Sequence, residues 1–312
     1  MKIHPSISVI IVSYNVEKLL LKCLQSLYRF KTSEIGLEII VVDNNSNDGT
    51  VEKVRAGFSE VIVIQNKFNA GFSAANNQGM EICIGDFIFL LNPDTEITSN
   101  CFSMMMDACT ENGERIVAPR LLNTNGTLQI SVHKFPGILS VITETFYLHK
   151  LLSAGNYSVK SFADKFNPDW ASGAALFFRK EVYKQVGLMD VNLFWMDDVD
   201  YCYRARKNNI YVNYIPKVEI YHHSGKSSEK NLPVTIANQL LSKIKYLTRH
   251  RGILVGIVAA LFVFIHIITR IVVFLILSIF GSRYHGKMKA YLFALKKFVD
   301  MIFHGKNEIA RN

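Results

Sequence analysis

The sequence predicts an α/β fold built on a mostly parallel sheet, followed by a helical segment that associates with a membrane. Two observations predict this. Strand-like and helix-like patterns alternate through the N-terminal third, and a long apolar segment with basic flanks begins at Ile253. The 312 residues suffice for one large domain or two modest ones. A hydrophobic content of 49% excludes a disordered chain, a collagen and a small disulfide scaffold.

Each expected strand is short and rich in apolar residues. Residues 7–12 form a β-branched run without a helical period, which is typical of a strand buried on both faces. Similar runs predict strands at residues 37–42, 61–64 and 87–91. Apolar spacing predicts helices over residues 16–30 and 71–84, and a turn at residues 47–49 begins another. Strands that alternate with helices indicate a parallel, doubly wound sheet.

Polar residues directly follow three of these strands, at residues 13–15, 43–45 and 92–94. Any one of these segments alone is explained by ordinary turn chemistry, because Asn, Asp, Ser and Pro favour turns. In parallel sheets, ligands bind beyond the carboxyl ends of the strands. Three polar segments at one edge therefore predict a binding site there.

The middle of the chain, residues 115–225, is less regular. Residues 123–127 contain the Asn-Gly signature of a hairpin turn. Residues 135–152 are rich in large apolar side chains, which fits either a core segment or a flap that faces an apolar substrate. Residues 196–207 carry acids at the start and bases at the end, so we expect a helix whose charges complement its dipole.

The positive charge is concentrated in the C-terminal tail. Residues 226–312 contain 14 basic and 3 acidic residues, whereas residues 1–225 contain 21 basic and 23 acidic residues. We expect a near-neutral globular domain over residues 1–227, a basic linker or helix over 228–251 and a membrane-associated helical region over 252–312. The basic residues flank an apolar segment and form no aromatic-studded groove, which argues against nucleic-acid binding.

The apolar segment over residues 253–280 is interrupted by His266 and Arg270. As one straight helix it exceeds the ~30 Å hydrocarbon core, at about 1.5 Å per residue. Arg270 near its middle costs about 3 kcal/mol on insertion scales, and basic residues on both sides fit poorly with a single crossing. We therefore expect a re-entrant or two-piece hairpin with both ends in the cytosol, which dips into one leaflet or crosses twice. Residues 286–303 are expected to form an amphipathic helix on anionic lipid.

Carboxylates are the residues most suited to chemistry. The chain has no G-x-G-x-x-G after the first strand and no G-x-x-x-x-G-K-[ST], which disfavours dinucleotide and P-loop chemistry. Asp43 can accept a hydrogen bond from a nucleobase N–H, and Asp94 can bind a divalent cation that bridges a diphosphate. In the pair Asp197-Asp198, adjacent helical side chains point about 100° apart, so one can face a pocket while the other caps the helix. The five cysteines lack C-x-x-C spacing and are expected to be free thiols.

Seven short segments, in order along the chain, resemble a known family. They are residues 8–15 (SVIIVSYN), 40–50 (IVVDNNSNDGT), 69–76 (NAGFSAAN), 90–94 (LLNPD), 170–174 (WASGA), 187–204 (GLMDVNLFWMDDVDYCYR) and 222–227 (HHSGKS). Together they resemble the family 2 inverting glycosyltransferases of the GT-A fold, in particular the rhamnosyltransferase-like branch. The resemblance covers residues 6–227.

The resemblance implies which residues bind the two substrates. Those on the nucleotide side are Ser13, Asn15, Asp43, Gly71, Phe72, Asn76, Asn92 and Arg204. Among them, Asp43 would recognise a uracil or thymine ring and Arg204 would pair with the diphosphate. Those on the acceptor side are Trp170, Gly173 and Trp195.

The resemblance also implies a metal and a catalytic base. Asp94 occupies the metal-ligand position of the family's D-x-D motif, whose first Asp is Asn92 in this chain. His222 is a further ligand by resemblance, with His223 as the alternative, and the implied cofactor is Mg²⁺ or Mn²⁺. Asp198 aligns with the acid that draws a proton from the acceptor hydroxyl. Beside it, Asp197 replaces the more common Glu, which leaves open which of the two acids acts.

The expected activity is transfer of a sugar from a nucleotide-sugar donor to a polyprenyl-diphosphate-linked or other glycan acceptor in cell-surface polysaccharide synthesis. L-rhamnose from dTDP-rhamnose is the leading donor by resemblance. One alternative is a glycosyltransferase that uses another UDP- or GDP-sugar. Another is a non-catalytic, membrane-tethered sugar-nucleotide binder or scaffold. Membrane lipid is the further expected partner, with the catalytic domain on the cytosolic face of the cell (inner) membrane and no nucleic acid bound.

Overall fold

The computed structural model of the chain describes residues 6–111, 113–148, 157–223 and 232–303. The chain divides into two compact units. Unit 1 comprises Met1–Lys134, Tyr157–Asp190 and Asp198–Gly225, and unit 2 comprises Phe135–Asn156, Val191–Asp197 and Lys226–Asn312. The expected domain boundaries at residues 227 and 251 stay predictions.

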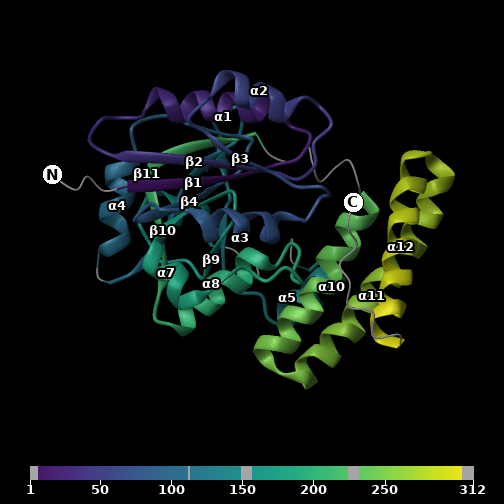
Figure 1. The fold of residues 1–312 in the computed structure, drawn as a ribbon. Helices are drawn as coiled ribbons and strands as arrows, with labels where there is room; N and C mark the ends of the chain where they lie inside the picture. The colour runs from purple at the N-terminus through teal and green to yellow at the C-terminus, as the bar shows by residue number, and fades with distance from the viewer. Residues whose placement is uncertain (1–5, 112, 149–156, 224–231, 304–312) are drawn as a thin grey trace. The chain divides into compact units, whose positions relative to one another are not determined.

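Unit 1 is built on a nine-stranded sheet in the order β3-β2-β1-β4-β10-β6-β11-β5, with β7 paired to β6 (Figure 1). Its strands are β1 Ser6–Ser13, β2 Gly36–Asp43, β3 Ile62–Gln65, β4 Phe87–Leu91, β5 Thr95–Ile97, β6 Arg115–Leu122, β7 Leu128–Gln129, β10 Ala175–Arg179 and β11 Tyr211–His222. The run β3-β2-β1-β4 is parallel throughout, as the alternating sequence pattern predicts. Antiparallel pairs enter through β10, β5 and β7, and β11 is parallel to β6. The predicted α/β class is confirmed.

Helices cover both faces of this sheet. They are α1 Glu17–Arg29, α2 Thr50–Gly57, α3 Phe72–Ile82, α4 Phe102–Thr110, α7 Lys180–Val186 and α8 Asp197–Lys207, with the 3₁₀ turn η1 Val159–Ala163. Figure 1 shows α1 and α2 on one face and α3 on the other. The strand β1 is buried on both faces, as its sequence predicts, because Val9 belongs to the same buried hydrophobic cluster as Leu24 of α1, while Ile10 faces Gly79 of α3. A Cβ on Gly79 would lie 2.4 Å from Ile10 Cγ2, so glycine allows α3 to approach the sheet.

The less regular middle of the chain places two small elements beside the sheet. The predicted hairpin turn is confirmed between β6 and β7, where the Asn123 N–H donates to Thr127 O at 2.8 Å and Gly126 has φ +80°. A separate two-stranded ladder pairs β8 Val132–His133 with β9 Trp170–Ala171 in antiparallel fashion. The helix expected over residues 196–207 is α8.

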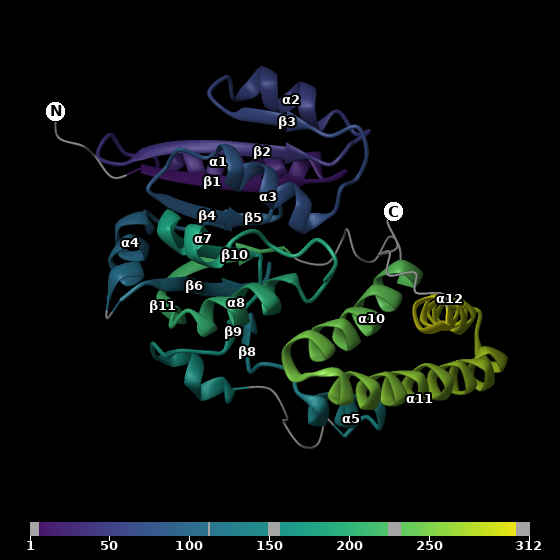
Figure 2. The ribbon, with the colours of Figure 1, turned by 60° about the horizontal axis from the view of Figure 1, so that its bottom comes forward.

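Unit 2 is helical in its described part. Its helices are α5 Ile138–Thr145, α10 Leu232–Arg251, α11 Ile253–Leu277 and α12 Arg283–Phe303, with the 3₁₀ turn η2 Ser278–Phe280. The expected two-piece hairpin within residues 253–280 is wrong, because α11 is one continuous helix (Figure 2). The guanidinium of Arg270, which we expected to interrupt it, instead bonds to backbone carbonyls of unit 2. Of the other apolar segment, expected over residues 135–152, residues 149–152 lie outside the described residues.

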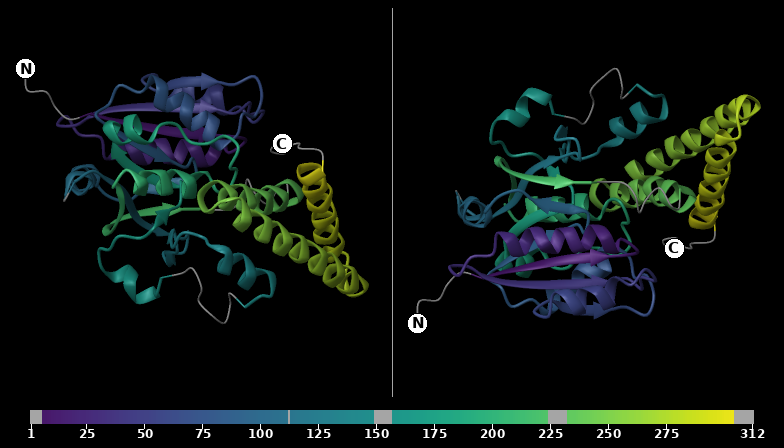
Figure 3. Two further views of the ribbon diagram at one scale, coloured as in Figure 1. Left: turned by 90° about the horizontal axis from the view of Figure 1, so that it is seen from below. Right: turned by 90° about the horizontal axis from the view of Figure 1, so that it is seen from above.

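The chain reverses after α11, and α12 returns beside it (Figure 3). Aromatic pairs fix the antiparallel register, because Phe264 meets Phe298 at 5.7 Å between ring centroids and Phe274 meets Tyr291 at 5.7 Å. Within the described residues, Ile253–Phe280 is the single segment with the length and apolarity to cross a membrane. The amphipathic helix expected over residues 286–303 lies within α12.

Candidate active site

The carboxyl ends of β1 and β2 form the first part of the site, where Ser13 lies opposite Asp43 in the parallel register. Asp43 is fully buried (0% exposed), and its Oδ2 accepts a hydrogen bond from the Ser46 N–H at 2.9 Å. Asp43 Oδ1 and Ser13 Oγ are buried without a hydrogen-bond partner in the described part of the chain. Buried polar atoms in proteins are nearly always paired. Two orphaned oxygens on neighbouring strand ends therefore mark atoms that a ligand can satisfy.

Asn15 orders the loop that supports Asp43. It has φ +52°, a left-handed conformation that Asn tolerates better than most residues. Its Oδ1 accepts from the Asn47 N–H at 2.8 Å, and its N–H donates to Ser46 Oγ at 2.9 Å. Asn15 thereby holds Ser46, whose own N–H donates to Asp43. Direct contact of Asn15 with a nucleotide stays a prediction.

The start of α3 forms a wall beside these strand ends. The Nδ2 of Asn44 donates to Gly71 O at 3.3 Å, which links the loop after β2 to the helix. Gly71 has φ +89°, a conformation that strongly favours glycine. Asn76 is buried and donates to Phe72 O at 3.0 Å within the helix. The Phe72 ring lies over Gly173, because a Cβ built there would meet the ring at 3.1 Å.

Asp198 lies next to the same glycine. Its Oδ2 accepts from the Gly173 N–H at 3.0 Å, and its Oδ1 accepts from the Val199 N–H at 2.8 Å. The following residue, Ala174, accepts from the Asn92 N–H at 2.9 Å and so joins this segment to the end of β4. An unbroken line of contacts thus connects the loops that carry the three predicted carboxylates.

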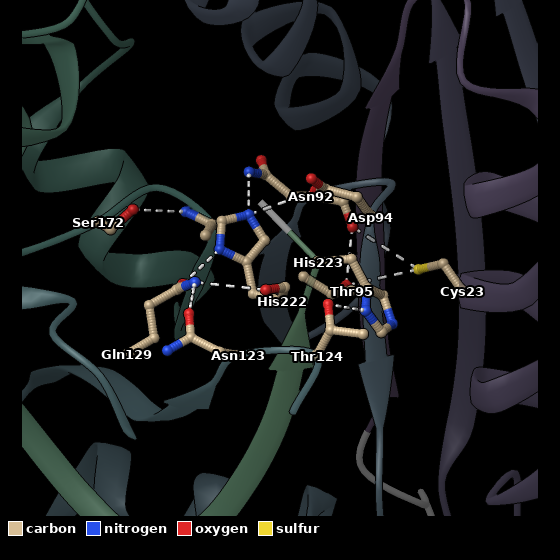
Figure 4. A network of polar contacts seen from close by, with 11 residues as sticks. Cys23, Asn92, Asp94, Thr95, Asn123, Thr124, Gln129, Ser172, His222 and His223 are labelled. Atoms are coloured by element: carbon tan, nitrogen blue, oxygen red, sulfur yellow. Dashed lines mark hydrogen bonds and ion pairs between the residues drawn. The ribbon is translucent and has the colours of Figure 1, made fainter. Parts of the chain in front are cut away.

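A cluster at the ends of β4 and β11 brings together the two predicted metal ligands (Figure 4). His222 Nε2 lies 3.3 Å from Asp94 Oδ1 and 3.3 Å from Asn92 Nδ2. The alternative ligand, His223, instead contacts Glu96 Oε1 at 2.9 Å and Thr124 Oγ1 at 2.9 Å. The geometry therefore favours His222 over His223. Residues 224–227 of the motif lie outside the described residues.

Gln129 also belongs to this cluster, although no sequence motif identifies it as a site residue. Its Nε2 donates to Asn123 Oδ1 at 2.9 Å, which leaves its Oε1 facing His222 Nδ1 at 2.6 Å. Nδ1 then carries the proton, and Nε2 presents a lone pair toward the Asp94 carboxylate. The Nε2 lone pair can accept a hydrogen bond from the Asn92 side-chain amide or coordinate a cation. A carboxylate oxygen and an imidazole nitrogen are ligand types that suit a divalent transition metal. Asp94 and His222 supply these two, and no group of three or more His, Cys, Asp or Glu that could hold a metal occurs among the described residues.

Other predicted residues have structural partners. Arg204 Nε pairs with Asp200 Oδ2 at 2.7 Å, and its other nitrogens donate to the carbonyls of Val186 and Leu188. A diphosphate would have to compete with these partners, so the predicted pairing of Arg204 with diphosphate stays a prediction. Trp170 stacks on His133 at 4.8 Å between ring centroids.

The acids of the Asp-Asp pair differ in burial. Asp197 is buried, whereas Asp198 is partly exposed, which favours Asp198 as the acid that can meet a substrate. Trp195 is 42% exposed and has φ +70°. The acceptor-side role of Trp195 and the catalytic roles of both acids stay predictions.

The thiols are unsuited to nucleophilic catalysis. All five cysteines are free and buried, as the sequence predicts. Burial raises the pKa of Cys23 and of Cys202 to about 12, so both stay protonated near neutral pH. A protonated, buried thiol is a poor nucleophile.

Two characterised proteins are similar to this chain in sequence. A low-salt glycan biosynthesis hexosyltransferase, Agl10 of Haloferax volcanii, is 25% identical over 222 residues, which cover 70% of this chain and 67% of that protein. An N-acetylglucosaminyl-diphospho-decaprenol L-rhamnosyltransferase of Mycobacterium tuberculosis is 22% identical over 238 residues, 70% of this chain and 78% of that protein.

A solved structure shows the same fold. The mannosyltransferase PcManGT from Pyrobaculum calidifontis, in complex with GDP-Man and Mn²⁺, aligns with a TM-score of 0.53 at 13% identity, over 98% of this chain and 89% of that one. This likeness supports the GT-A fold predicted from the sequence. The family model for glycosyl transferase family 2 matches residues 8–187, which is more than half of the chain. The chain therefore belongs to glycosyl transferase family 2 and is a glycosyltransferase.

Proposed function

We propose that the protein transfers a sugar, with inversion at the anomeric carbon, from a nucleoside-diphosphate donor to a lipid-linked glycan at the cytosolic face of the cell membrane. The observation that carries this proposal is the line of contacts that joins the loops of Asp43, Asp94 and Asp198. A nucleobase N–H satisfies Asp43 Oδ1, which is otherwise unpaired in the described residues. The diphosphate then lies toward Asp94.

In this reaction Asp198 acts as the base. The carboxylate removes the proton from the acceptor hydroxyl while that oxygen bonds to the anomeric carbon and the bond to the nucleoside diphosphate breaks. The hydrogen bond from the Gly173 N–H orients Asp198 Oδ2. Because water or buffer then takes up the proton, Asp198 returns to its starting state and no covalent enzyme intermediate forms.

Asp94 and His222 are the residues that would hold a divalent cation, Mg²⁺ or Mn²⁺. When bound, the cation offsets negative charge on the departing diphosphate. The donor set supports this, because a carboxylate oxygen and an imidazole nitrogen lie 3.3 Å apart. Gln129 would keep the Nε2 lone pair of His222 directed at the ion.

The names of two relatives support the proposed acceptor and donor. The mycobacterial relative is named for a diphospho-decaprenol acceptor and for L-rhamnose, and the Haloferax relative for hexose transfer. An apolar C-terminal helix supports a lipid-linked acceptor, because holding enzyme and acceptor at one membrane raises their effective concentration. We take dTDP-rhamnose as the leading donor and a UDP- or GDP-hexose as the alternative.

A donor panel tests the proposal. Purified full-length protein in vesicles is incubated with a polyprenyl-diphosphate-GlcNAc acceptor and, separately, with labelled dTDP-rhamnose, UDP-glucose, UDP-GlcNAc and GDP-mannose. We expect one donor to label the lipid fraction, and the Asp198→Asn variant to lose the product while it still binds nucleotide. Asp107→Asn, an exposed acid on α4, is the matched control. Nucleotide binding without transfer from any donor would instead indicate the scaffold alternative.

A further inference from the structure

The helix α11 presents an apolar face along its whole length. Between Ile253 and Phe280, every exposed side chain is Ile, Leu, Val or Phe. These residues recur at helical spacing, for example at Leu254, Leu261 and Ile276, and we call this set the α11 stripe. At about 1.5 Å per residue the stripe extends for almost 40 Å. The exposed residues form two groups, 253–264 and 272–280, and the residues between them are half-buried or buried. Apolar surface of this extent on a folded protein marks a site of association.

The opposite face of α11 is buried within unit 2. Gly256, Ala259, Val263, Ile267 and Arg270 are buried at helical spacing. The helices α5, α10 and α12 all pack against α11. One face of α11 is therefore buried against its neighbouring helices and the other is exposed, although the helix is apolar almost throughout.

Arg270 is the polar group on the buried face, and it is fully engaged there. It is 3% exposed, and its guanidinium donates to the backbone carbonyls of Thr145 and Glu144, the latter at 2.9 Å. The guanidinium also lies over the Tyr147 ring, 3.8 Å from its centroid. These carbonyls end α5, where a cation is favoured by the helix dipole. Arg270 thereby ties α5 to the second half of α11.

The helices tied to α11 are too polar to enter a hydrocarbon core. The Glu144 carboxylate pairs with Lys243 of α10, and both side chains are partly exposed. The helix α10 also carries the polar residues Asn238 and Lys245. If α11 crossed a bilayer, these groups would be carried into the hydrocarbon with it, at a large free-energy cost for each charge. A helix that lies parallel to the surface keeps them in the interfacial region.

Basic residues occur at both ends of the stripe. Arg249 and Arg251 precede α11, and Arg283, Lys287 and Lys289 follow it; all five are exposed. Positive charge at both ends is complementary to an anionic lipid surface. It fits poorly with a single crossing, for which basic residues collect on one side.

We propose that α11 lies in the plane of a membrane that contains anionic lipid, with the α11 stripe among the acyl chains and with the Arg270-bound α5 preventing a crossing. The proposal deepens the membrane association in the proposed function. It does not depend on sugar transfer, so its test is read without enzyme activity.

Spin-label depth measurements test the orientation. Single cysteines replace Leu254, Leu261, Val272 and Ile279 in the full-length protein, whose native cysteines are all buried. Each variant is labelled with a nitroxide and bound to vesicles of equal parts phosphatidylcholine and phosphatidylglycerol. We expect all four labels to reach the same shallow depth. A depth profile that peaks at the central labels and falls at both ends would show a crossing and overturn the proposal.

Vesicle flotation tests the surface itself. The double variant Leu261→Glu/Ile276→Glu should bind the same vesicles at least tenfold more weakly, while Ile84→Glu, at a residue that is 78% exposed in unit 1, should bind like the parent. Circular dichroism and nucleotide binding check that each variant is folded. Flotation of a folded double variant equal to the parent would overturn the proposal. So would a parent that dimerises without binding vesicles, because a second copy would then cover the stripe.

Discussion

Substitution of Asp43 by Asn tests how the site recognises a nucleobase. Asp43 Oδ2 accepts from the Ser46 N–H, and Oδ1 has no partner in the described residues. An asparagine of the same shape must keep its oxygen toward Ser46, because a buried N–H without an acceptor costs about 1–3 kcal/mol. Its Nδ2 therefore takes the position of Oδ1. In uracil and thymine the N3–H is a donor, so the ligand then meets a donor instead of an acceptor.

The magnitude follows from the bond that is lost. A hydrogen bond to a charged group contributes about 1.5–3 kcal/mol, and each 1.4 kcal/mol is a factor of ten in affinity. We expect the Asp43→Asn variant to bind dTDP and UDP roughly 10- to 150-fold more weakly.

Isothermal titration calorimetry with dTDP, UDP and CDP measures the effect. Cytosine has an acceptor at N3, so the Asp43→Asn variant should lose less affinity for CDP than for UDP. The exposed acid Asp107, changed to Asn, is the control and should leave all three dissociation constants unchanged. If the Asp43→Asn variant, shown to be folded, binds dTDP and UDP within twofold of the parent, Asp43 does not contact the base.

Three further predictions concern catalysis, packing and the thiols. Asp198→Asn should lower kcat by roughly 10²–10⁴ with an unchanged Kd for dTDP, measured by product formation and calorimetry, and unchanged kcat would remove it as the base. Gly79→Ala should lower the free energy of unfolding, measured in urea, by about 1–3 kcal/mol, because the added Cβ would lie 2.4 Å from Ile10 Cγ2. Gly57→Ala is the control and should not destabilise the protein, because a Cβ at residue 57 would have no atom within 4 Å. Burial raises the pKa of Cys23 to about 12, above its ordinary 9.0, so the native protein should resist Ellman's reagent at pH 8, and its stability should fall as pH rises above 9; stoichiometric labelling of the native protein would contradict this.

Local sequence pattern was sufficient for the first half of the sheet. The predicted strands at residues 7–12, 37–42 and 87–91 are β1, β2 and β4, because apolar runs of that length between helical segments have one stable arrangement. The same pattern placed Ser13 and Asp43 at one edge, since parallel strands end on the same side. These features depend on residues that are close together in the sequence, so the sequence alone was sufficient to predict them.

The second half required long-range pairing that no local pattern shows. The strand β10 inserts between β4 and β6 in antiparallel fashion, and this brings Gly173 to Asp198 and Ala174 to Asn92. The β6–β7 hairpin brings Gln129 to His222 through its register. Register depends on the whole sheet, so sequence spacing alone could not identify Gln129 as a partner of His222.

The tail shows the same division. Its composition alone determined that residues 253–280 form an apolar segment with basic flanks. Whether Arg270 would break that segment depended on a partner more than a hundred residues earlier, and only the folded chain supplies the carbonyls of α5. A guanidinium whose hydrogen bonds are satisfied inside the protein no longer needs a break in the helix to reach water, and for that reason α11 is continuous.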